Sequence, residues 1–169
     1  MIEKAREGEY APFYETYVSK VPEGDVLAFL QQQADTFPVW LRSLASKADY
    51  RYGTDKWSIA QILHHCNDCE RIFSYRALSI ARGEKQALPG MDQNEYMDGA
   101  NTSELSYESL VKEFETVRAA TLSLAASLSP SALTHEGNAS GVPVTVRALL
   151  AIIAGHLAHH ESVIKERYL

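Results

Sequence analysis

The chain has 169 residues, of which 46% are hydrophobic and 22% are charged, which suits one folded domain whose core needs no disulfide or zinc staple. A formal charge of -6 without a cluster of Lys and Arg excludes nucleic acid as an expected partner, because phosphate binding needs clustered positive charge. No apolar run approaches the ~20 residues of a membrane span, and no basic-then-apolar leader opens the chain, so we expect a cytoplasmic protein without a membrane partner.

The periodicity of apolar residues predicts long helices and no strand. Residues 1–24 mix charged with aromatic side chains, and we expect this N-terminal extension to pack on the outside of the single domain formed by residues 1–169. Asp25 is a candidate N-cap for the first long helix, which the apolar pattern places from Val26 to Leu44. Pro38 lies inside this helix, and because proline removes a backbone hydrogen bond, we expect a kink or a break just before it.

The second predicted helix begins after Ser58, since Ser58 and Gln61 have the spacing of a capping box. Gly83 is its expected stop. Residues 84–103 lack clear periodicity, and a connection of this length in a compact domain is typical of a lid or a crossover.

The third predicted helix spans about residues 106–127, on an apolar stripe with three- and four-residue steps. Residues 129–145 are rich in turn-forming proline and glycine, so we expect a loop there. Thr145 is the expected N-cap of the last helix, which continues to about Arg167.

Histidines lie on the apolar faces of two of these helices. His156 and His160 continue the apolar stripe of the last helix and lie one turn apart, which suits two ligands of one metal ion. His159 falls about 100° away from His160 and is expected at the rim. In the second helix, His65 belongs to the buried series. His64 falls on a polar face that also carries Asn67, Asp68 and Arg71.

Three imidazoles on two inward faces predict a metal site. Burying them costs free energy unless each finds a partner, and one cation would satisfy all three, whereas a single buried histidine is usually a hydrogen-bonded core residue. A zinc protease would need Glu after the first histidine of its pair, and that position is Leu157. A di-iron bundle would need Glu three residues before its histidines, and none of the three has one.

Cys66 and Cys69 form a C-x-x-C sequence inside the second predicted helix. A redox pair of this kind usually follows a strand, and a structural zinc cage would need a second cysteine pair that the chain lacks. We therefore expect two small residues on a buried face.

The chain resembles the DinB/YfiT-like superfamily over nearly its whole length. The resemblance is carried by a Trp-Ser element with a histidine eight residues after the Trp, by Ala-Arg-Gly with a later Leu-Pro-Gly, and by a late Gly-His-x-x-His-His. These elements are Trp57-Ser58 with His65, residues 81–83 with 88–90, and residues 155–160. The resemblance implies an all-α four-helix bundle with a long crossover connection, commonly a homodimer. It also implies one divalent ion, often zinc or nickel, on His65, His156 and His160.

Relatives in this superfamily include thiol S-transferases and maleylpyruvate isomerases. The resemblance therefore implies a metal-dependent transferase that uses a low-molecular-weight thiol on a small-molecule substrate. Two alternatives stay open: a metal-dependent hydrolase, and a non-enzymatic, stress-related metal-binding dimer whose ion is structural. Thiol-independent turnover would favour the first, and a fourth protein ligand on the ion would favour the second.

Further residues have candidate roles beside an ordinary structural one. Asp68 could orient an imidazole or act as a base, or it is a solvated helix residue. Arg76 and Arg82 could bind a carboxylate of substrate or thiol, or form a salt bridge to a neighbouring helix. Whether the metal shell gains a further ligand is left open for His64, His159, Cys66 and Cys69.

Overall fold

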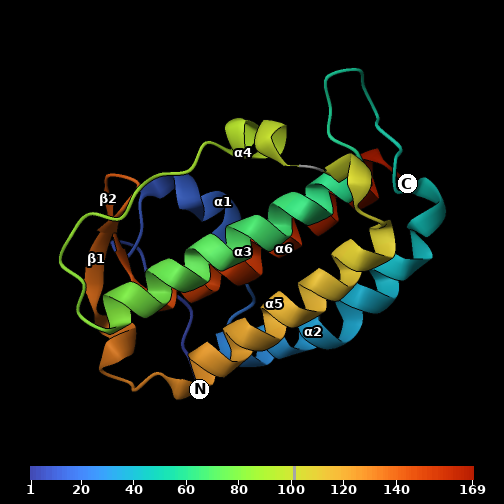
Figure 1. The fold of residues 1–169 in the computed structure, drawn as a ribbon. Coiled ribbons are helices and arrows are strands. Elements are labelled where there is room, and N and C mark those ends of the chain that lie inside the picture. Colours follow the sequence, from blue (N-terminus) through green and yellow to red (C-terminus); the bar gives the residue numbers. More distant parts are fainter. Residues whose placement is uncertain (101) are drawn as a thin grey trace.

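Four long helices form a bundle, which confirms the predicted fold class. The structure, a computed structural model, describes residues 1–100 and 102–169. The long helices are α2 (Val26–Ser43), α3 (Ile59–Ala81), α5 (Tyr107–Ser127) and α6 (Val146–Arg167). Helix α3 packs against α5 and α6, and α2 packs against the same two helices from the other side (Figure 1). None of the described helices combines the length and the apolar composition of a membrane span.

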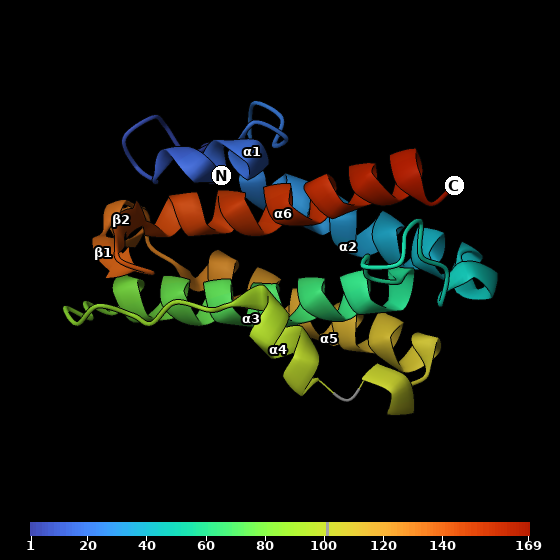
Figure 2. The ribbon, with the colours of Figure 1, turned by 90° about the horizontal axis from the view of Figure 1, so that it is seen from above.

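The order of helix directions explains the long connection after α3. Helices α3 and α5 run in the same direction, opposite to α2 and α6 (Figures 1 and 2). The chain must therefore return along the whole bundle between the end of α3 and the start of α5. The crossover that does so contains one short helix, α4 (Gln93–Gly99), which the sequence periodicity did not reveal.

The predicted caps begin three of the long helices. The Asp25 side chain accepts a hydrogen bond from the backbone N–H of Leu27 at 3.1 Å. Ser58 and Gln61 form both hydrogen bonds of a capping box. Thr145 accepts from the N–H of Ala148 at 3.2 Å. These local contacts satisfy N–H groups that the first turn of a helix leaves without a backbone partner, so the sequence marks where each helix begins.

A kink or a break was predicted just before Pro38, and helix α2 continues through this residue without a break. Proline in a helix interior removes one hydrogen bond and crowds the carbonyl four residues earlier, at a cost of about 3 kcal/mol. Phe37 and Pro38 are buried, and the Phe37 ring packs against Phe114 of α5 with ring centroids 5.2 Å apart. Burying apolar side chains of this size stabilises by about 1.5–3 kcal/mol each, which together offsets the cost of the proline.

The structure also contains two short strands where a loop was predicted. Strands β1 (Glu136–Ala139) and β2 (Val142–Thr145) pair antiparallel. The turn between them is made by Ser140 with φ 56° and Gly141 with φ 79°, and positive φ at both central residues is typical of a tight hairpin. Four-residue strands carry too little alternation to be recognised from sequence.

The N-terminal extension lies on α6. It contains the short helix α1 (Glu15–Val18), which packs against α6 on the outside of the bundle (Figure 2). A Cβ atom at Gly155 of α6 would lie 2.0 Å from the carbonyl oxygen of Tyr17, so only glycine permits this close approach. The extension is also held by a hydrogen bond of 2.7 Å that Nε of Arg147 donates to Glu9.

Single 3₁₀ turns occur at Pro12–Tyr14, Ala45–Lys47, Thr102–Glu104 and Ala132–Thr134.

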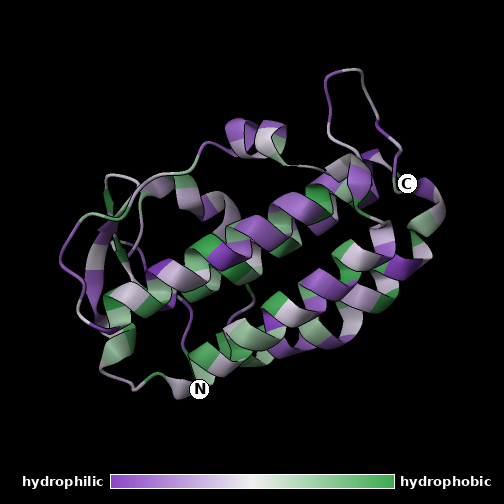
Figure 3. Cartoon of the chain, viewed as in Figure 1, coloured by the Kyte–Doolittle hydropathy of each residue, from purple (hydrophilic) through white to green (hydrophobic). Residues whose placement is uncertain are grey.

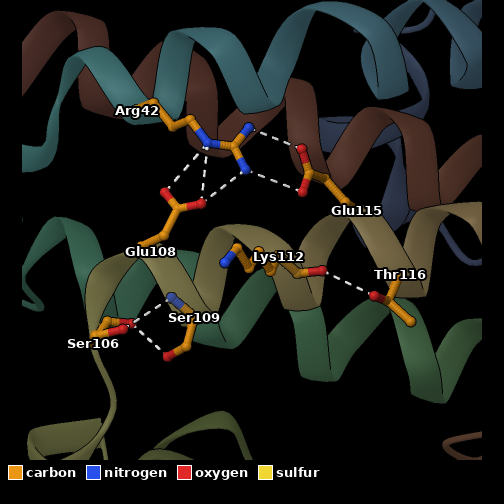
Figure 4. A network of polar contacts seen from close by, with 7 residues as sticks. All are labelled: Arg42, Ser106, Glu108, Ser109, Lys112, Glu115 and Thr116. Atoms are coloured by element: carbon orange, nitrogen blue, oxygen red, sulfur yellow. Dashed lines mark hydrogen bonds and ion pairs between the residues drawn. The ribbon is translucent and has the colours of Figure 1, made fainter.

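Polar contacts between helices differ with depth. Along α3, both green (hydrophobic) and purple (hydrophilic) bands are visible in Figure 3. At the surface, Arg42 of α2 donates to Glu108 and Glu115 of α5 (Figure 4). In the core, Arg118 of α5 makes a two-bond ion pair with Glu70 of α3, at 2.7 and 2.9 Å.

Candidate metal centre

The structure brings the three predicted histidines together in the middle of the bundle. His65 comes from α3, and His156 and His160 come from the neighbouring antiparallel helix α6. The Nε2 atom of His156 lies 3.1 Å from Nε2 of His65 and 3.2 Å from Nε2 of His160. The ring centroids of His65 and His160 are 5.0 Å apart. The helical faces derived from the sequence thus converge on one point.

These imidazoles are held in the neutral form. Burial lowers the pKa of His65 to about 4 and that of His160 to about 3. Burial lowers the pKa of His156 still more clearly below its usual value, and the adjacent His160 and His65 add to this effect. A neutral imidazole keeps one nitrogen lone pair free, which is the form that binds metals.

The contacts among the three rings fit a shared cation better than hydrogen bonding. The Nε2 atom of His156 has either one hydrogen or one lone pair, so its two short contacts are not both good hydrogen bonds. Zinc–nitrogen bonds of about 2.0–2.1 Å place tetrahedral ligand nitrogens about 3.3 Å apart, close to the two separations that His156 makes with His65 and His160. Within the described part of the chain, the buried Nδ1 atom of His160, on the other side of that ring from its Nε2 contact, has no hydrogen-bond partner.

Both cysteines lie beside the histidines. They are free and buried, as predicted. The Sγ atom of Cys69 is 3.6 Å from both ring nitrogens of His65. Two overlapping sets of three ligand atoms within 4.8 Å share His156: one adds His65 and Cys69, and the other adds Cys66 and His160. The sequence interpretation treated the cysteines as small buried residues and left open whether either one adds to the metal shell.

Burial keeps these thiols protonated in the absence of a metal. It raises the pKa of Cys69 to about 12, with a further contribution from Asp68, and raises that of Cys66 well above its usual range. A thiol of this kind is a poor nucleophile, because the thiolate is the reactive form.

Asp68 and His64 face the interface between α3 and α5. The Asp68 carboxylate lies 3.5 Å from Nε2 of His64 and 3.7 Å from Arg71, and burial raises its pKa. The polar face predicted for this side of α3 is partly internal, since Asn67 is fully buried and donates to Glu113 at 3.1 Å. The polar partners found for Asp68 thus belong to this interface, and neither Asp68 nor His64 joins the three-histidine cluster.

The two arginines with candidate carboxylate-binding roles are placed differently. Arg76 is 4% exposed, and its Nη2 donates to the carbonyl of Pro89 at 2.7 Å and to Oγ of Ser140 at 3.0 Å. It therefore ties the crossover and the hairpin to α3. Arg82 is exposed and follows the last residue of α3.

Aromatic rings form two walls of the histidine cluster. The Tyr17 ring meets His156 edge-on with centroids 5.1 Å apart, and His159 at 5.4 Å. The Trp57 ring lies 4.9 Å from His65. Sequence reasoning missed Tyr17, because a contact between the N-terminal extension and the last helix leaves no periodic signal. The Trp57 contact could have been inferred from its fixed spacing to His65.

An open pocket of about 250 Å³ lies next to the cluster. His160 and His159 form part of its wall, together with Trp57. Its other lining residues come from the loop before α3, the first turn of α3, the start of α4 and the C-terminal end of α6: Tyr52, Asp55, Lys56, Ile62, Gln93, Asn94, Val163 and Tyr168. The pocket gives small molecules a route to one side of the histidine cluster, and His159 occupies the predicted rim.

The arrangement defines an all-α bundle with a long crossover and a buried histidine cluster beside a pocket. A family profile of the DinB superfamily matches residues 28–164, and the chain belongs to this superfamily. It is also similar in structure to YfiT from Bacillus subtilis, described as a probable metal-dependent hydrolase with an unusual four-helix bundle topology. The TM-score is 0.70 at 15% identity, over 95% of this chain and 94% of that one, a likeness that shows the shared fold. A comparison with curated proteins gives no match.

Proposed function

We propose that the protein is a metal-dependent enzyme acting on a small molecule, with one divalent ion held by His65, His156 and His160. The observation that carries this proposal is the short approach of Nε2 of His156 to Nε2 of both His65 and His160, with His160 also lining an open pocket. Membership in the DinB superfamily and the description of YfiT as a probable metal-dependent hydrolase support a divalent ion. Zinc and nickel are the ions that the imidazole donors favour.

An ion on three neutral imidazoles keeps its full charge and supplies Lewis acidity, which lowers the pKa of a bound nucleophile. The protein contributes the surroundings. Tyr17 and Trp57 cover the rings of His156 and His65, which limits the access of bulk water from those sides. Lys56, Gln93 and Asn94 offer polar groups to a substrate in the pocket beside His160.

The proposed nucleophile is a low-molecular-weight thiol. Its S–H proton would pass to solvent, its sulfur would bond to an electrophilic carbon of the substrate, and a leaving group would depart from that carbon with the electron pair of the broken bond. The support for the thiol is the resemblance to thiol-dependent members of the superfamily. Arg82, at the exposed end of α3, stays a candidate for binding a carboxylate. Arg76 already donates to Pro89 and Ser140, so we assign it a structural role. Asp68 stays a candidate base only if substrate binding changes its pairing with His64.

Hydrolysis is the second candidate, with water as the nucleophile, and the description of YfiT favours it. A structural ion in a non-enzymatic dimer is the third. The homodimer and the cytoplasmic location stay predictions.

Metal analysis of protein purified without a histidine tag tests the site. Wild type is expected to hold one divalent ion per chain, and the triple variant His65→Ala/His156→Ala/His160→Ala is expected to hold none. The His64→Ala variant is a matched control, since its ring faces Asp68 and Glu113 instead of the cluster. Stoichiometric metal in the triple variant would refute the proposed site.

Substrate screening of the metal-loaded protein tests the reaction. Electrophiles would be offered with and without bacillithiol, glutathione, mycothiol or coenzyme A. Turnover that needs a thiol supports the transferase, and cleavage of esters or amides without any thiol supports the hydrolase. Loss of either activity in His160→Ala would assign it to this site.

A further inference from the structure

We propose that Cys69 is a fourth protein ligand of the ion, so that the donor set is three imidazoles and one thiolate. This inference rests on the proposed metal site and names a donor that neither the family match nor the sequence pattern assigns. It is drawn from the position of the sulfur among the imidazole nitrogens.

The distances around Cys69 are those of atoms that share an ion. Its Sγ lies 3.6 Å from both Nε2 and Nδ1 of His65, and this Nε2 lies 3.1 Å from Nε2 of His156. Zinc bonds of about 2.0–2.1 Å to nitrogen and about 2.3 Å to sulfur place tetrahedral nitrogen and sulfur donors about 3.6 Å apart. The three donor atoms of His65, Cys69 and His156 lie within 4.8 Å of one another, and all three residues are buried.

The helix places the two donors of α3 together. His65 and Cys69 are four residues apart, so their side chains lie on one face of α3, one turn apart. His156 and His160 have the same spacing on α6. These two pairs lie on adjacent helices, and His156 belongs both to the ligand set with His65 and Cys69 and to the one with His160.

Cys66 is the weaker candidate of the two cysteines. Each cysteine belongs to one set of ligand atoms within 4.8 Å of one another, and Cys69 in addition contacts Nε2 of His65 at 3.6 Å. Cys66 also lies in an apolar cluster with Phe114 and Leu157. It offers a matched control, because it is a second buried thiol on the same helix.

A thiolate donor changes which ion the site selects. It lowers the net charge of the ion with its ligands from +2 to +1 and favours thiophilic ions such as zinc and cobalt over magnesium and manganese. Four protein ligands are usual in structural zinc sites, while catalytic zinc also expands to five. A fourth protein ligand thus favours the structural ion, the third candidate, and turnover in the substrate screen would show instead that the ion is catalytic.

Cobalt spectroscopy tests the inference on the full chain. Metal-free protein would be titrated with Co²⁺ while bound cobalt and near-ultraviolet absorption are measured. Wild type is expected to bind one cobalt with a sulfur-to-cobalt charge-transfer band. Cys69→Ala is expected to lose the band, keep cobalt on its histidines, and bind it at least about tenfold more weakly in competition with a chelator. Cys66→Ala is expected to keep both the band and the affinity.

The possible outcomes distinguish a failure of the Cys69 proposal from a failure of the histidine site itself. Stoichiometric cobalt without the band in wild type, or a full band in Cys69→Ala, overturns the role of Cys69 and leaves the histidine site standing. No bound cobalt and no bound zinc in wild type overturns the proposed function as well. Circular dichroism checks the fold. If Cys69→Ala does not fold, Cys69→Ser replaces it, since a hydroxyl cannot produce the sulfur band.

Discussion

The bundle contains two buried polar clusters, and they differ in whether their members satisfy one another. In the first, the Arg118 guanidinium pairs with the Glu70 carboxylate and also donates to Gln33 at 2.9 Å and to the carbonyl of Leu30. In the second, His65, His156 and His160 point ring nitrogens at one another. The charges of the first cluster cancel, whereas the second collects lone pairs of one kind.

The Arg118 cluster connects all four long helices. Arg118 belongs to α5, Glu70 to α3 and Gln33 to α2, and the amide of Gln33 donates to the carbonyl of Ala154 in α6 at 2.9 Å. Its members are nearly inaccessible, with Arg118 at 0% exposure. A buried polar group in this core needs a partner that offsets its loss of hydration. Glu70 and Arg118 find that partner in each other, and we propose that a bound ion is the partner of the histidines.

The largest expected effect comes from breaking the self-sufficient cluster. Arg118→Met leaves the Glu70 carboxylate buried without its partner, and we expect a loss of about 3–5 kcal/mol in the free energy of unfolding by urea. The double variant Glu70→Met/Arg118→Met should recover most of this loss, because it leaves no buried charge. If Arg118→Met alone had a free energy of unfolding close to that of wild type, water would have to reach the Glu70 carboxylate, and the predicted loss would be wrong.

Acid should act mainly on the histidine cluster. In the unfolded chain His65 titrates near its usual pKa of about 6.5, while the folded state lowers this pKa to about 4. Below about pH 6.5 the unfolded state therefore binds more protons, so stability is full above that pH and falls as the pH drops toward 4.

His65 alone should lower the free energy of unfolding of the metal-free protein by about 1.4 kcal/mol at pH 5.5 relative to pH 7.5. His156 and His160 add in the same direction, because burial lowers their pKa values too. Urea unfolding at the two pH values measures the loss, and His65→Leu should reduce it. Equal losses in wild type and variant would contradict a neutral buried His65.

A smaller effect is expected where the N-terminal extension covers the histidines. In Gly155→Ala, the new methyl group meets the carbonyl of Tyr17, so α1 must move away from α6. We expect a loss of about 1–3 kcal/mol together with faster hydrogen exchange in residues 12–18. Ala154→Gly is a control on the neighbouring position. Unchanged hydrogen exchange of residues 12–18 in Gly155→Ala would show that α1 moves away from α6 without becoming less stable.

The smallest effect is expected at the surface cluster of Figure 4. Arg42 pairs with Glu108 and Glu115 across α2 and α5, but it is exposed to solvent. Exposed ion pairs gain little, because water and salt screen them. Arg42→Ala should leave the urea midpoint close to that of wild type at physiological salt. A loss of stability as large as that of Arg118→Met would show that the exposed and the buried ion pairs contribute equally, against this prediction.

Local signals in the sequence predicted much of the fold. The capping box at Ser58 and the cap at Thr145 mark helix starts because their hydrogen bonds form within a few residues. Apolar periodicity separated His65 from His64 because it reports which side of a helix faces inward. The hairpin at Ser140 was not predicted, because its strands are short and lie against the end of α3. A break at Pro38 does not occur, because side chains around Phe37 pack against α5.

By itself, the sequence determined the four helices and the inward faces that carry His65, His156 and His160, because both follow from spacing along one helix. Only the tertiary structure decided which side chains meet across helices. It paired Arg118 with Glu70, turned Asp68 toward His64, and placed the sulfur of Cys69 beside His65. The physical reason is that such pairs depend on which helices are neighbours and how they are rotated, and no local pattern in one segment specifies that.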